Sequence, residues 1–551
     1  MRRFSALEGR KAPKSATCFG AMLELASTSD GAGAMLELAS TSDGAGAVLE
    51  LASTSDAGRY YVASRAISQG ETVLTARPSA WAPLWPCELS ELSERELAVV
   101  KADPGPKPPD SEPPSDEEAG LKEAIMYDGS SDSGEEDREF VGSVSLYWLL
   151  AVRTALLARD SPDSFAAVQT LQDHGNERPR AQQAKLEAMG RRLSRALQMG
   201  AGVSLEAAAT SHLLGALLVN AFGTRSGLFG ASTSGEADGA GIFVTAAMFN
   251  HSCVPCCYAD LSLRPRDTAE DGGSADNGGS IVFVACRPIA QGEAVSISYL
   301  DTSEPTHVRQ RLLRRTKHFV CRCALCVDAD EGGRRGGLLR CPTCACPATD
   351  GATATWCAPS PPPPARPTAW VCARCGGASE AAQVWALDAI LRRRLRHAGV
   401  GPEATPQYER IERAVLGAGF HPNHALVLQC RLARLAYCVH GAAADAADAA
   451  RRCGLAEAAL ATATALLEPF DAQKAELLFK LGSWRQQLGA LSPPRSDEAR
   501  AAYHAGGAAL LESARQFAFV CGKDAKPTAA ARELAALCMR SLKSARAGTC
   551  G

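Results

Sequence analysis

The stretch Asn-His-Ser-Cys-Val-Pro-Cys at residues 250–256 decides how this chain folds, because it joins polar side chains, a thiol and a turn-forming proline. Two further signals follow it in order. A Gly-Glu turn at 292–293 precedes a short strand pattern that closes on Tyr299, and residues 321–326 then spell C-x-C-x-x-C. The polar turn can hold a charged ligand, the tyrosine can face a reacting group, and the thiolates can bind zinc.

Composition limits the classes of protein that this chain can belong to. Its 551 residues suffice for roughly three or four domains, and 46% of them are hydrophobic, enough for real cores. The net charge of −3 argues against bulk electrostatic binding of nucleic acid. No apolar run reaches the ~18 residues of a membrane span, and the first residues lack the apolar core of a secretory signal.

The chain has 21 cysteines, nine of which lie between residues 321 and 375. Without a secretory signal, such clusters indicate zinc sites rather than disulfides. We therefore expect a reducing compartment, the cytoplasm, the nucleus or both.

The first 56 residues are repetitive. Two identical copies of AMLELASTSDGAG fill 21–33 and 34–46, and a diverged copy begins at Ala47. We expect a disordered tail over 1–56, of which only the last copy needs to join the fold. A second segment, 101–140, is rich in Pro, Ser, Asp and Glu and predicts an acidic, disordered linker.

Between these segments the pattern alternates between strand and helix. A hairpin is expected from strands at 60–63 and 72–74 around the turn at 68–71. Helices are expected at 141–159 and 205–222, and short strands at 242–244, 281–285 and 294–299. From residue 381 onward, Ala- and Leu-rich helical patterns dominate and are broken at proline pairs.

The 250–256 motif, Tyr299 and the 321–326 cysteines together resemble the SET-domain lysine methyltransferases, and among them the SMYD (SET and MYND) branch. The resemblance implies an α+β multidomain protein: a β-rich SET domain with a helical insert, zinc-stapled post-SET and zinc-ribbon segments, and an all-α C-terminal domain resembling tetratricopeptide stacks. The domains would span 57–328, 335–380 and 381–551. Because residues 88–139 contain neither Cys nor His, the MYND finger is absent.

The resemblance assigns candidate residues for S-adenosylmethionine (AdoMet). Gly58 and Arg59 occupy the family's first glycine loop, where Tyr60 replaces a second glycine and would be strained if that position needs a positive φ. The remaining cofactor residues implied by the family are Asn220, Asn250, His251 and Phe319, of which Phe319 would stack on the adenine. A second departure is Cys256, which stands where the family has an asparagine that braces a chain crossing.

Tyr299 resembles the family's active-site tyrosine. Methyl transfer to an amine is an in-line displacement, so the main task of the site is alignment. A phenol can orient the amine without competing as a nucleophile. An apolar channel and the positive sulfonium both favour the neutral form of lysine, so no strong base is required. The residue could instead be a plain strand aromatic.

Two zinc sites are expected, both structural. The resemblance implies that Cys253 completes a four-thiolate site with Cys321, Cys323 and Cys326, clamping the post-SET segment over the cofactor pocket. A zinc-ribbon pattern comes from two C-x-x-C knuckles, with Cys346 and Cys357 as spare ligands; the knuckle residues are Cys341, Cys344, Cys372 and Cys375. This ribbon is either a metal-stapled module or a surface that reads a partner.

The sequence thus predicts an AdoMet-dependent protein-lysine methyltransferase that acts on histone or non-histone proteins, without membrane or primary nucleic-acid partners, and monomeric. One alternative is a catalytically weak SET scaffold that binds proteins. A zinc-ribbon chromatin or nucleic-acid factor is a third possibility, and the near-neutral charge speaks against it. The C-terminal helices could bind partners or only pack on the SET domain.

Overall fold

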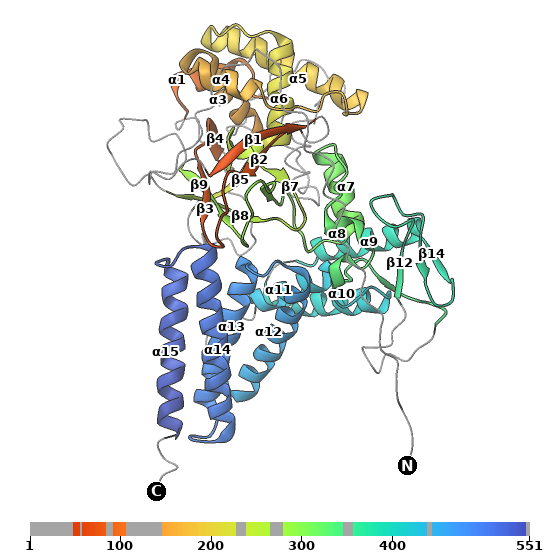
Figure 1. The fold of residues 1–551 in the computed structure, drawn as a ribbon, viewed down its shortest axis with the longest axis vertical. Helices are drawn as coiled ribbons and strands as arrows, with labels where there is room; N and C mark the ends of the chain where they lie inside the picture. Colours follow the sequence, from red (N-terminus) through yellow and green to blue (C-terminus); the bar gives the residue numbers. More distant parts are fainter. Residues whose placement is uncertain are drawn as a thin grey trace, which may run out of the picture. The chain divides into compact units, whose positions relative to one another are not determined.

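A six-stranded sheet, a helical insert, a small four-stranded sheet and a series of C-terminal helices make up the chain (Figure 1). The computed structural model describes most of the residues after 47, and all of these belong to one compact unit. The ranges that it describes are 48–54, 58–83, 92–105, 146–226, 239–264, 279–344, 356–399, 401–437 and 443–546.

The diverged third repeat joins the fold as a strand. β1 (Leu49–Thr54) pairs antiparallel with β2 (Gly58–Ala63), so the described fold begins inside the segment 1–56, in the one repeat copy that was expected to join it. The earlier repeat copies lie outside the described residues. The expected hairpin between 60–63 and 72–74 was wrong, because β2 pairs with β1 and not with β3 (Thr72–Ala76). β3 lies in the six-stranded sheet instead.

The six-stranded sheet has the order β3-β9-β8-β5-β6-β4. Phe222, Phe243, Phe249 and Phe283 meet beside it through ring contacts of 4.6–6.3 Å and form much of its aromatic core. Its remaining strands are β4 (Ala80–Pro83), β5 (Ala221–Ser226), β6 (Gly239–Ile242), β8 (Cys257–Arg264) and β9 (Ser280–Ala285).

The helical insert consists of five described helices. Only the second and the last of them were expected, although Ser93 and Glu96 form a capping box that marks the start of the first, α1 (Glu94–Ala102). Most of the acidic linker lies outside the described residues. The other helices are α3 (Leu146–Asp160), α4 (Pro162–Gln169), α5 (Arg180–Ala201) and α6 (Ala207–Asn220). Since α6 runs directly into β5, the end of this helix lies beside the sheet.

Two short strands outside the six-stranded sheet, β7 (Asn250–His251) and β10 (Ser296–Ile297), pair in parallel. Only two residues of the expected strand at 294–299 are therefore in β10. The 3₁₀ turn η2 (Ala246–Met248) comes before β7, and α7 (Thr306–Thr316), α8 (Ala324–Val327) and η3 (Glu331–Gly333) follow β10.

The ribbon segment forms a four-stranded antiparallel sheet in sequential order. Its strands are β11 (Leu339–Arg340), β12 (Trp356–Ser360), β13 (Ala369–Cys372) and β14 (Ala378–Glu380). Buried Trp370 on β13 donates its indole N–H to the carbonyl of Gly337 at 2.7 Å. Each cysteine knuckle follows one strand of this sheet.

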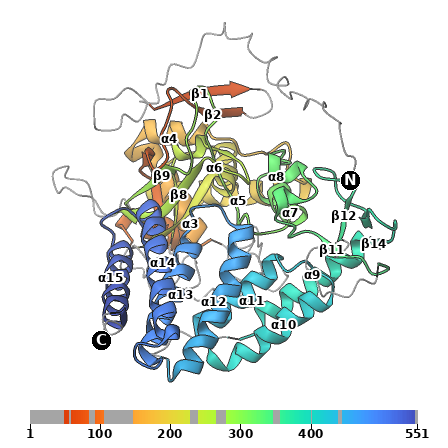
Figure 2. The ribbon, with the colours of Figure 1, turned by 60° about the horizontal axis from the view of Figure 1, so that its bottom comes forward.

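Seven helices follow, and successive ones from α9 to α15 pack on each other (Figure 2). Gly482 and Gly506 let α13 and α14 approach closely, since a Cβ on Gly482 would lie 2.5 Å from a carbon of Leu510. None of the described helices is long and apolar enough for a membrane span. The helices are α9 (Ala381–Arg396), α10 (Thr405–Gly417, after the 3₁₀ turn η4, Pro402–Ala404), α11 (Ala425–Tyr437), α12 (Ala446–Leu466), α13 (Ala472–Leu491), α14 (Asp497–Val520) and α15 (Lys526–Arg546).

A buried ion-pair network joins these helices to the segment that follows β10. Arg392 on α9 donates to both carboxylate oxygens of Glu304, at 2.8 and 2.7 Å, and to Asp388 at 2.8 Å. Removing one partner of such a buried pair costs about 3–5 kcal/mol. The C-terminal helices therefore help to hold the segment that carries α7 and three of the candidate zinc ligands, Cys321, Cys323 and Cys326.

Candidate active site and metal centres

The crossing of β7 and β10 brings the candidate cofactor and catalytic residues together. Asn250 pairs with Ser296 and His251 with Ile297, although the two strands are more than forty residues apart. The backbone N–H of Tyr299 donates to Nδ1 of His251 at 3.0 Å, and their ring centres are 5.2 Å apart. The structure thus places His251 and Tyr299 in contact, and their roles in one site stay a prediction.

Tyr299 is held by its hydroxyl as well as by its backbone. The phenol donates to the carbonyl of Phe249, whose ring packs 5.1 Å from Tyr61 and 4.6 Å from Phe283. Burial raises the pKa of Tyr299, so the phenol stays neutral at physiological pH. A neutral hydroxyl fixed on a carbonyl is suited to orient a polar group and not to act as an anionic nucleophile.

Aromatic rings line the same place. Phe319 lies 5.9 Å from His251 and 6.5 Å from Tyr299, measured between ring centres. Because Phe319 comes two residues before Cys321, the first cysteine cluster fixes its position. The three half-buried rings can receive a flat heteroaromatic group.

The glycine loop begins with Gly58, which has a left-handed φ of 64° and open space where a Cβ would lie. Tyr60 lies in β2 opposite Ala52 and is absent from the described non-glycine residues with positive φ. The strain considered at this position is therefore not present. The guanidinium of Arg59 donates to the carbonyl and hydroxyl of Thr170, at 2.6 and 3.1 Å, and so ties β2 to the end of α4.

Asn220 has a structural role in the described fold. Its side-chain amide donates to the carbonyls of Gln172 and Ala216, at 2.8 and 2.9 Å, and so completes the end of α6. Its predicted contact with a cofactor stays a prediction.

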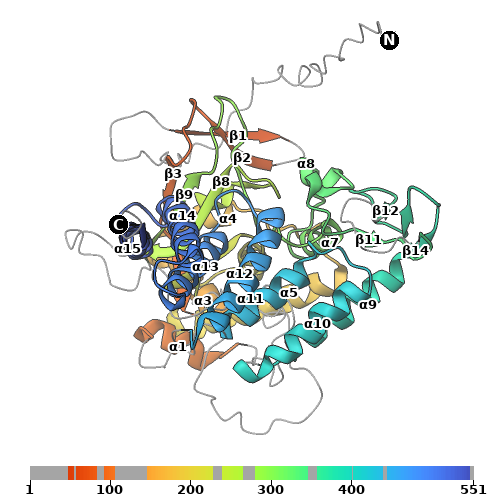
Figure 3. The same ribbon diagram turned by 90° about the horizontal axis from the view of Figure 1, so that it is seen from below.

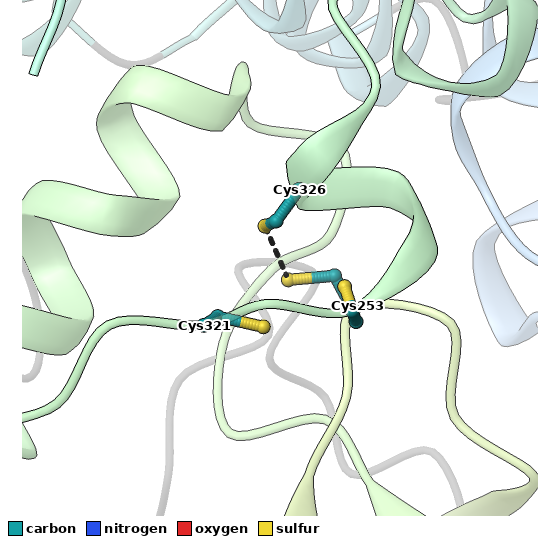
Figure 4. Close-up of side chains that lie close together, drawn as sticks. Cys253, Cys321 and Cys326 are labelled. Carbon is teal, nitrogen blue, oxygen red and sulfur yellow. Dashed lines mark hydrogen bonds between the residues drawn. The ribbon is translucent and has the colours of Figure 1, made fainter. Parts of the chain in front are cut away.

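The first cysteine cluster joins Cys253 to the post-SET segment. Its four Sγ atoms, from Cys253, Cys321, Cys323 and Cys326, lie within 4.8 Å of one another. Cys253 and Cys326 are 3.5 Å apart, and Figure 4 shows their thiols converging with that of Cys321. Tetrahedral zinc with Zn–S bonds of about 2.3 Å needs sulfurs roughly 3.8 Å apart, so the four residues fit this metal.

The electrostatics of this cluster also favour a cation. Hydrogen bonding with Cys253 lowers the pKa of Cys321, and the same interaction raises the pKa of Cys253. Four thiolates at this separation would repel each other, so full ionisation needs a bound metal. The buried guanidinium of Arg309 donates to the sulfur of Cys326 at 3.8 Å and so stabilises the thiolate form that a metal ligand needs.

The second cluster has the geometry of two ribbon knuckles. Its members, Cys341, Cys344, Cys372 and Cys375, also place all four Sγ atoms within 4.8 Å. Cys341 and Cys375 are 3.5 Å apart, and the N–H groups of Cys344 and Gly377 donate to sulfurs at 3.3 Å. Of the spare cysteines, Cys357 lies on β12 outside this group, and Cys346 lies outside the described residues.

Cys256 takes over a bracing contact at the crossing. Its sulfur accepts the backbone N–H of Ser296 at 3.1 Å, and the residue is 1% exposed. A hydrogen bond from Cys257 is the main cause that lowers the pKa of Cys256, to about 6. A thiolate is a strong acceptor, so β10 is held here without an asparagine.

Sequence reasoning missed Lys317, which lies inside the candidate site. Its Nζ donates to the carbonyl of Val219 at 2.7 Å and lies 5.2 Å from the centre of the Tyr299 ring. The residue is 8% exposed. A lysine directly after a basic helix gives no sequence signal of burial, because such residues usually cap the helix end in solvent.

The part of the chain that contains His251 and Tyr299 is similar to known proteins. The SET domain family matches residues 58–300. Among similar proteins, SET domain-containing protein SmydA-8, isoform B, of Drosophila melanogaster is 30% identical over 122 residues, which cover 22% of this chain and 23% of that protein. Histone-lysine N-methyltransferase SET5 of Meyerozyma guilliermondii is 36% identical over 95 residues, 17% of each chain. Protein-lysine N-trimethyltransferase SMYD5 of Homo sapiens is 35% identical over 98 residues, 17% of this chain and 20% of that protein.

The chain therefore contains a SET domain, and its relatives include SMYD proteins and other SET-family lysine methyltransferases. The matched segments span only about a fifth of these relatives. The ribbon and the C-terminal helices are characterised by the structure alone.

Proposed function

We propose that this protein transfers the methyl group of AdoMet to lysine side chains of histone or non-histone proteins. The observation that carries the proposal is the contact of His251 with both Tyr299 and Cys253, at 3.0 and 3.2 Å. One residue thus connects the candidate catalytic tyrosine to the candidate zinc cluster.

The residues present fit AdoMet. Phe319 and His251 offer aromatic faces for an adenine, and Asn250 offers polar groups beside them. Gly58 leaves open space at the start of β2, where a chain can approach a ligand closely. We assign cofactor binding to these residues together with Arg59 and Asn220. The last two would bind the cofactor through polar atoms that their hydrogen bonds within the fold do not use.

Bound AdoMet would supply an electrophilic methyl group. Tyr299 would align the incoming amine, since its neutral hydroxyl is already fixed against the carbonyl of Phe249. Correct alignment is the largest contribution that such a site can make to an in-line displacement. The apolar surroundings of Phe249 and Phe319 disfavour a charged acceptor, so the lysine reacts as the neutral amine.

Both zinc ions would be structural. The first would fasten Phe319 and the post-SET segment against β7, and the second would staple the ribbon at 335–380. In this proposal 57–328 is the catalytic part, 381–551 is a helical support, and the protein acts as a monomer in the cytoplasm, the nucleus or both.

The experiment incubates zinc-loaded protein with methyl-labelled AdoMet and a protein extract, followed by hydrolysis and detection of methyllysine. Wild type should label lysine, and Tyr299→Phe should lower the rate roughly 10²-fold. Tyr503→Phe, a half-buried tyrosine on α14, is the matched control and should keep the wild-type rate. Equal labelling by wild type and Tyr299→Phe would remove Tyr299 from this role.

The alternative of a catalytically weak SET scaffold has one observation in its favour. The charge of Lys317 lies beside Tyr299, where a positive sulfonium and an amine would have to enter. Under this alternative the wild-type protein would bind no AdoMet, and methyllysine would not form.

A further inference from the structure

A cavity of about 420 Å³ lies away from the crossing, between α7, the proline-rich loop after β12 and the start of α9. Figure 3 shows α7 beside the ribbon strands β11 and β12. Proline and tryptophan side chains give the cavity apolar walls, and four arginines give it charge. The lining residues used below are Arg311, Arg314, Arg315, Arg366, His307, Gln310 and Trp385.

Three of the four arginines come from one side of the cavity, the helix α7. Arg311, Arg314 and Arg315 have the i, i+3, i+4 spacing that puts side chains on one face of α7. Like charges at this spacing cost a helix about 0.2–0.5 kcal/mol per pair. The helix dipole offsets this cost at Arg314 and Arg315 in the last turn, but it does not account for Arg311 or for Arg366 on the facing loop.

None of the described residues that line the cavity carries a carboxylate. The nearby acidic groups are already committed, because Glu304 pairs with Arg392 and the Glu331 carboxylate accepts N–H groups of Thr306 and Gly337. Within the described residues, Arg311 and Arg366 have no ion-pair partner. Arg366 instead lies 4.7 Å over the ring of Trp385, which leaves the edge of its guanidinium for a ligand.

Two buried polar atoms of the lining are also unsatisfied. Nε2 of His307 and Oε1 of Gln310 have no hydrogen-bond partner among the described residues, and Gln310 is only 5% exposed. Leaving such groups unpaired costs about 1–3 kcal/mol each. The other end of the Gln310 amide donates to the carbonyl of Cys321 at 2.6 Å, so this side chain connects the cavity wall to the first cysteine cluster.

We propose that this cavity is a docking site for an acidic segment of a partner protein. Carboxylates would pair with Arg311 and Arg366, and an apolar side chain would pack on Trp385 and the proline walls. A nucleic acid fits less well, because apolar proline walls do not track a phosphate backbone and the whole chain has a net charge of −3. The inference does not depend on methyl transfer.

The test is a fluorescence anisotropy titration of the full-length protein with a labelled octapeptide of glutamates and two leucines. Arg311→Glu/Arg366→Glu should raise the Kd at least tenfold. Arg393→Glu/Arg394→Glu changes charge equally on exposed residues of α9 outside the cavity, and it should alter the Kd less than twofold. An octapeptide with glutamine in place of glutamate should bind at least tenfold more weakly.

Three results would overturn the proposal. The first is an absence of binding by wild type, and the second is equal weakening by the two double variants, which would indicate charge without a site. The third is a single-stranded oligonucleotide that binds tighter than the peptide and loses affinity with Arg311→Glu/Arg366→Glu. Circular dichroism of both variants, which change exposed side chains, checks that the fold is intact.

Discussion

Nε2 of His251 lies 3.2 Å from the sulfur of Cys253. Because Nδ1 of the same ring accepts the N–H of Tyr299, the neutral ring carries its proton on Nε2 and donates it to the sulfur. A candidate cofactor residue is therefore oriented by a candidate metal ligand. Groups that hydrogen-bond to a metal ligand usually affect function nearly as strongly as the ligands themselves do.

Loss of zinc from the first cysteine cluster should weaken AdoMet binding, whereas loss of zinc from the second cluster should not. Wild type should hold two zinc ions per chain, one for each group of four cysteines. Cys321→Ser/Cys323→Ser should lose one zinc ion and bind AdoMet at least tenfold more weakly, because Phe319 and His251 lose their anchor. Elemental analysis and calorimetry measure the two quantities.

Cys372→Ser/Cys375→Ser is the matched control. It should also lose one zinc ion, while its AdoMet affinity stays within twofold of wild type. Equal loss of AdoMet binding by both double variants would contradict a specific clamp at Cys253.

Cys256 should make the stability of the crossing of β7 and β10 depend on pH. An unfolded cysteine titrates near 8.5, whereas the pKa of Cys256 is lowered to about 6 in the fold, mainly by Cys257. The stabilisation is thus complete above about pH 8.5, falls as the pH decreases and is lost below about 6. The Ser296 amide, which donates to this sulfur, should become at least ~10-fold better protected from hydrogen exchange between pH 6 and 8.5, corrected for intrinsic rates.

Cys256→Ser keeps an acceptor atom but does not ionise in this range. Its Ser296 protection should not change with pH. If wild type and Cys256→Ser show the same pH dependence, the thiolate does not brace β10.

Lys317 should discriminate between AdoMet and its product. Its ammonium lies 5.2 Å from the Tyr299 ring, and the sulfonium of AdoMet is positive whereas the thioether of S-adenosylhomocysteine is neutral. Like charges in a partly buried site repel by about a kcal/mol or more. Lys317→Met should therefore tighten AdoMet binding about 5- to 10-fold relative to S-adenosylhomocysteine.

Lys317→Arg keeps the charge and should keep the wild-type ratio of the two affinities. An unchanged ratio in Lys317→Met would show that the charge does not reach the sulfur position. Calorimetry with both ligands measures the ratio, and it does not depend on methyl transfer.

Much of the site could be predicted because its residues come from short motifs with fixed chemistry. Cysteine spacing predicted the four thiols of the ribbon and three of the first group, and the resemblance to SET proteins added Cys253, about seventy residues before those three. The resemblance also implied the α+β class, and the apolar, Ala- and Leu-rich composition of segments such as α6 and α13 predicted their helices.

What the sequence could not give depends on contacts between distant segments. The pairing of β2 with β1 follows from the third repeat, whose pattern is the same as in the copies before it. The acceptor role of Cys256 toward Ser296 and the burial of Lys317 against Val219 both arise only when the crossing forms. The helices α1 and α5, which were not expected, are exceptions because local signals mark them: a capping box at Ser93 begins α1, and α5 has a continuous apolar face.

Calorimetric titration of the zinc-loaded, full-length protein with AdoMet tests the central claim most directly. One AdoMet molecule should bind per chain, and binding should be lost when Cys321 and Cys323 are replaced. A protein that retains both zinc ions and gives no binding heat with AdoMet or S-adenosylhomocysteine would contradict it.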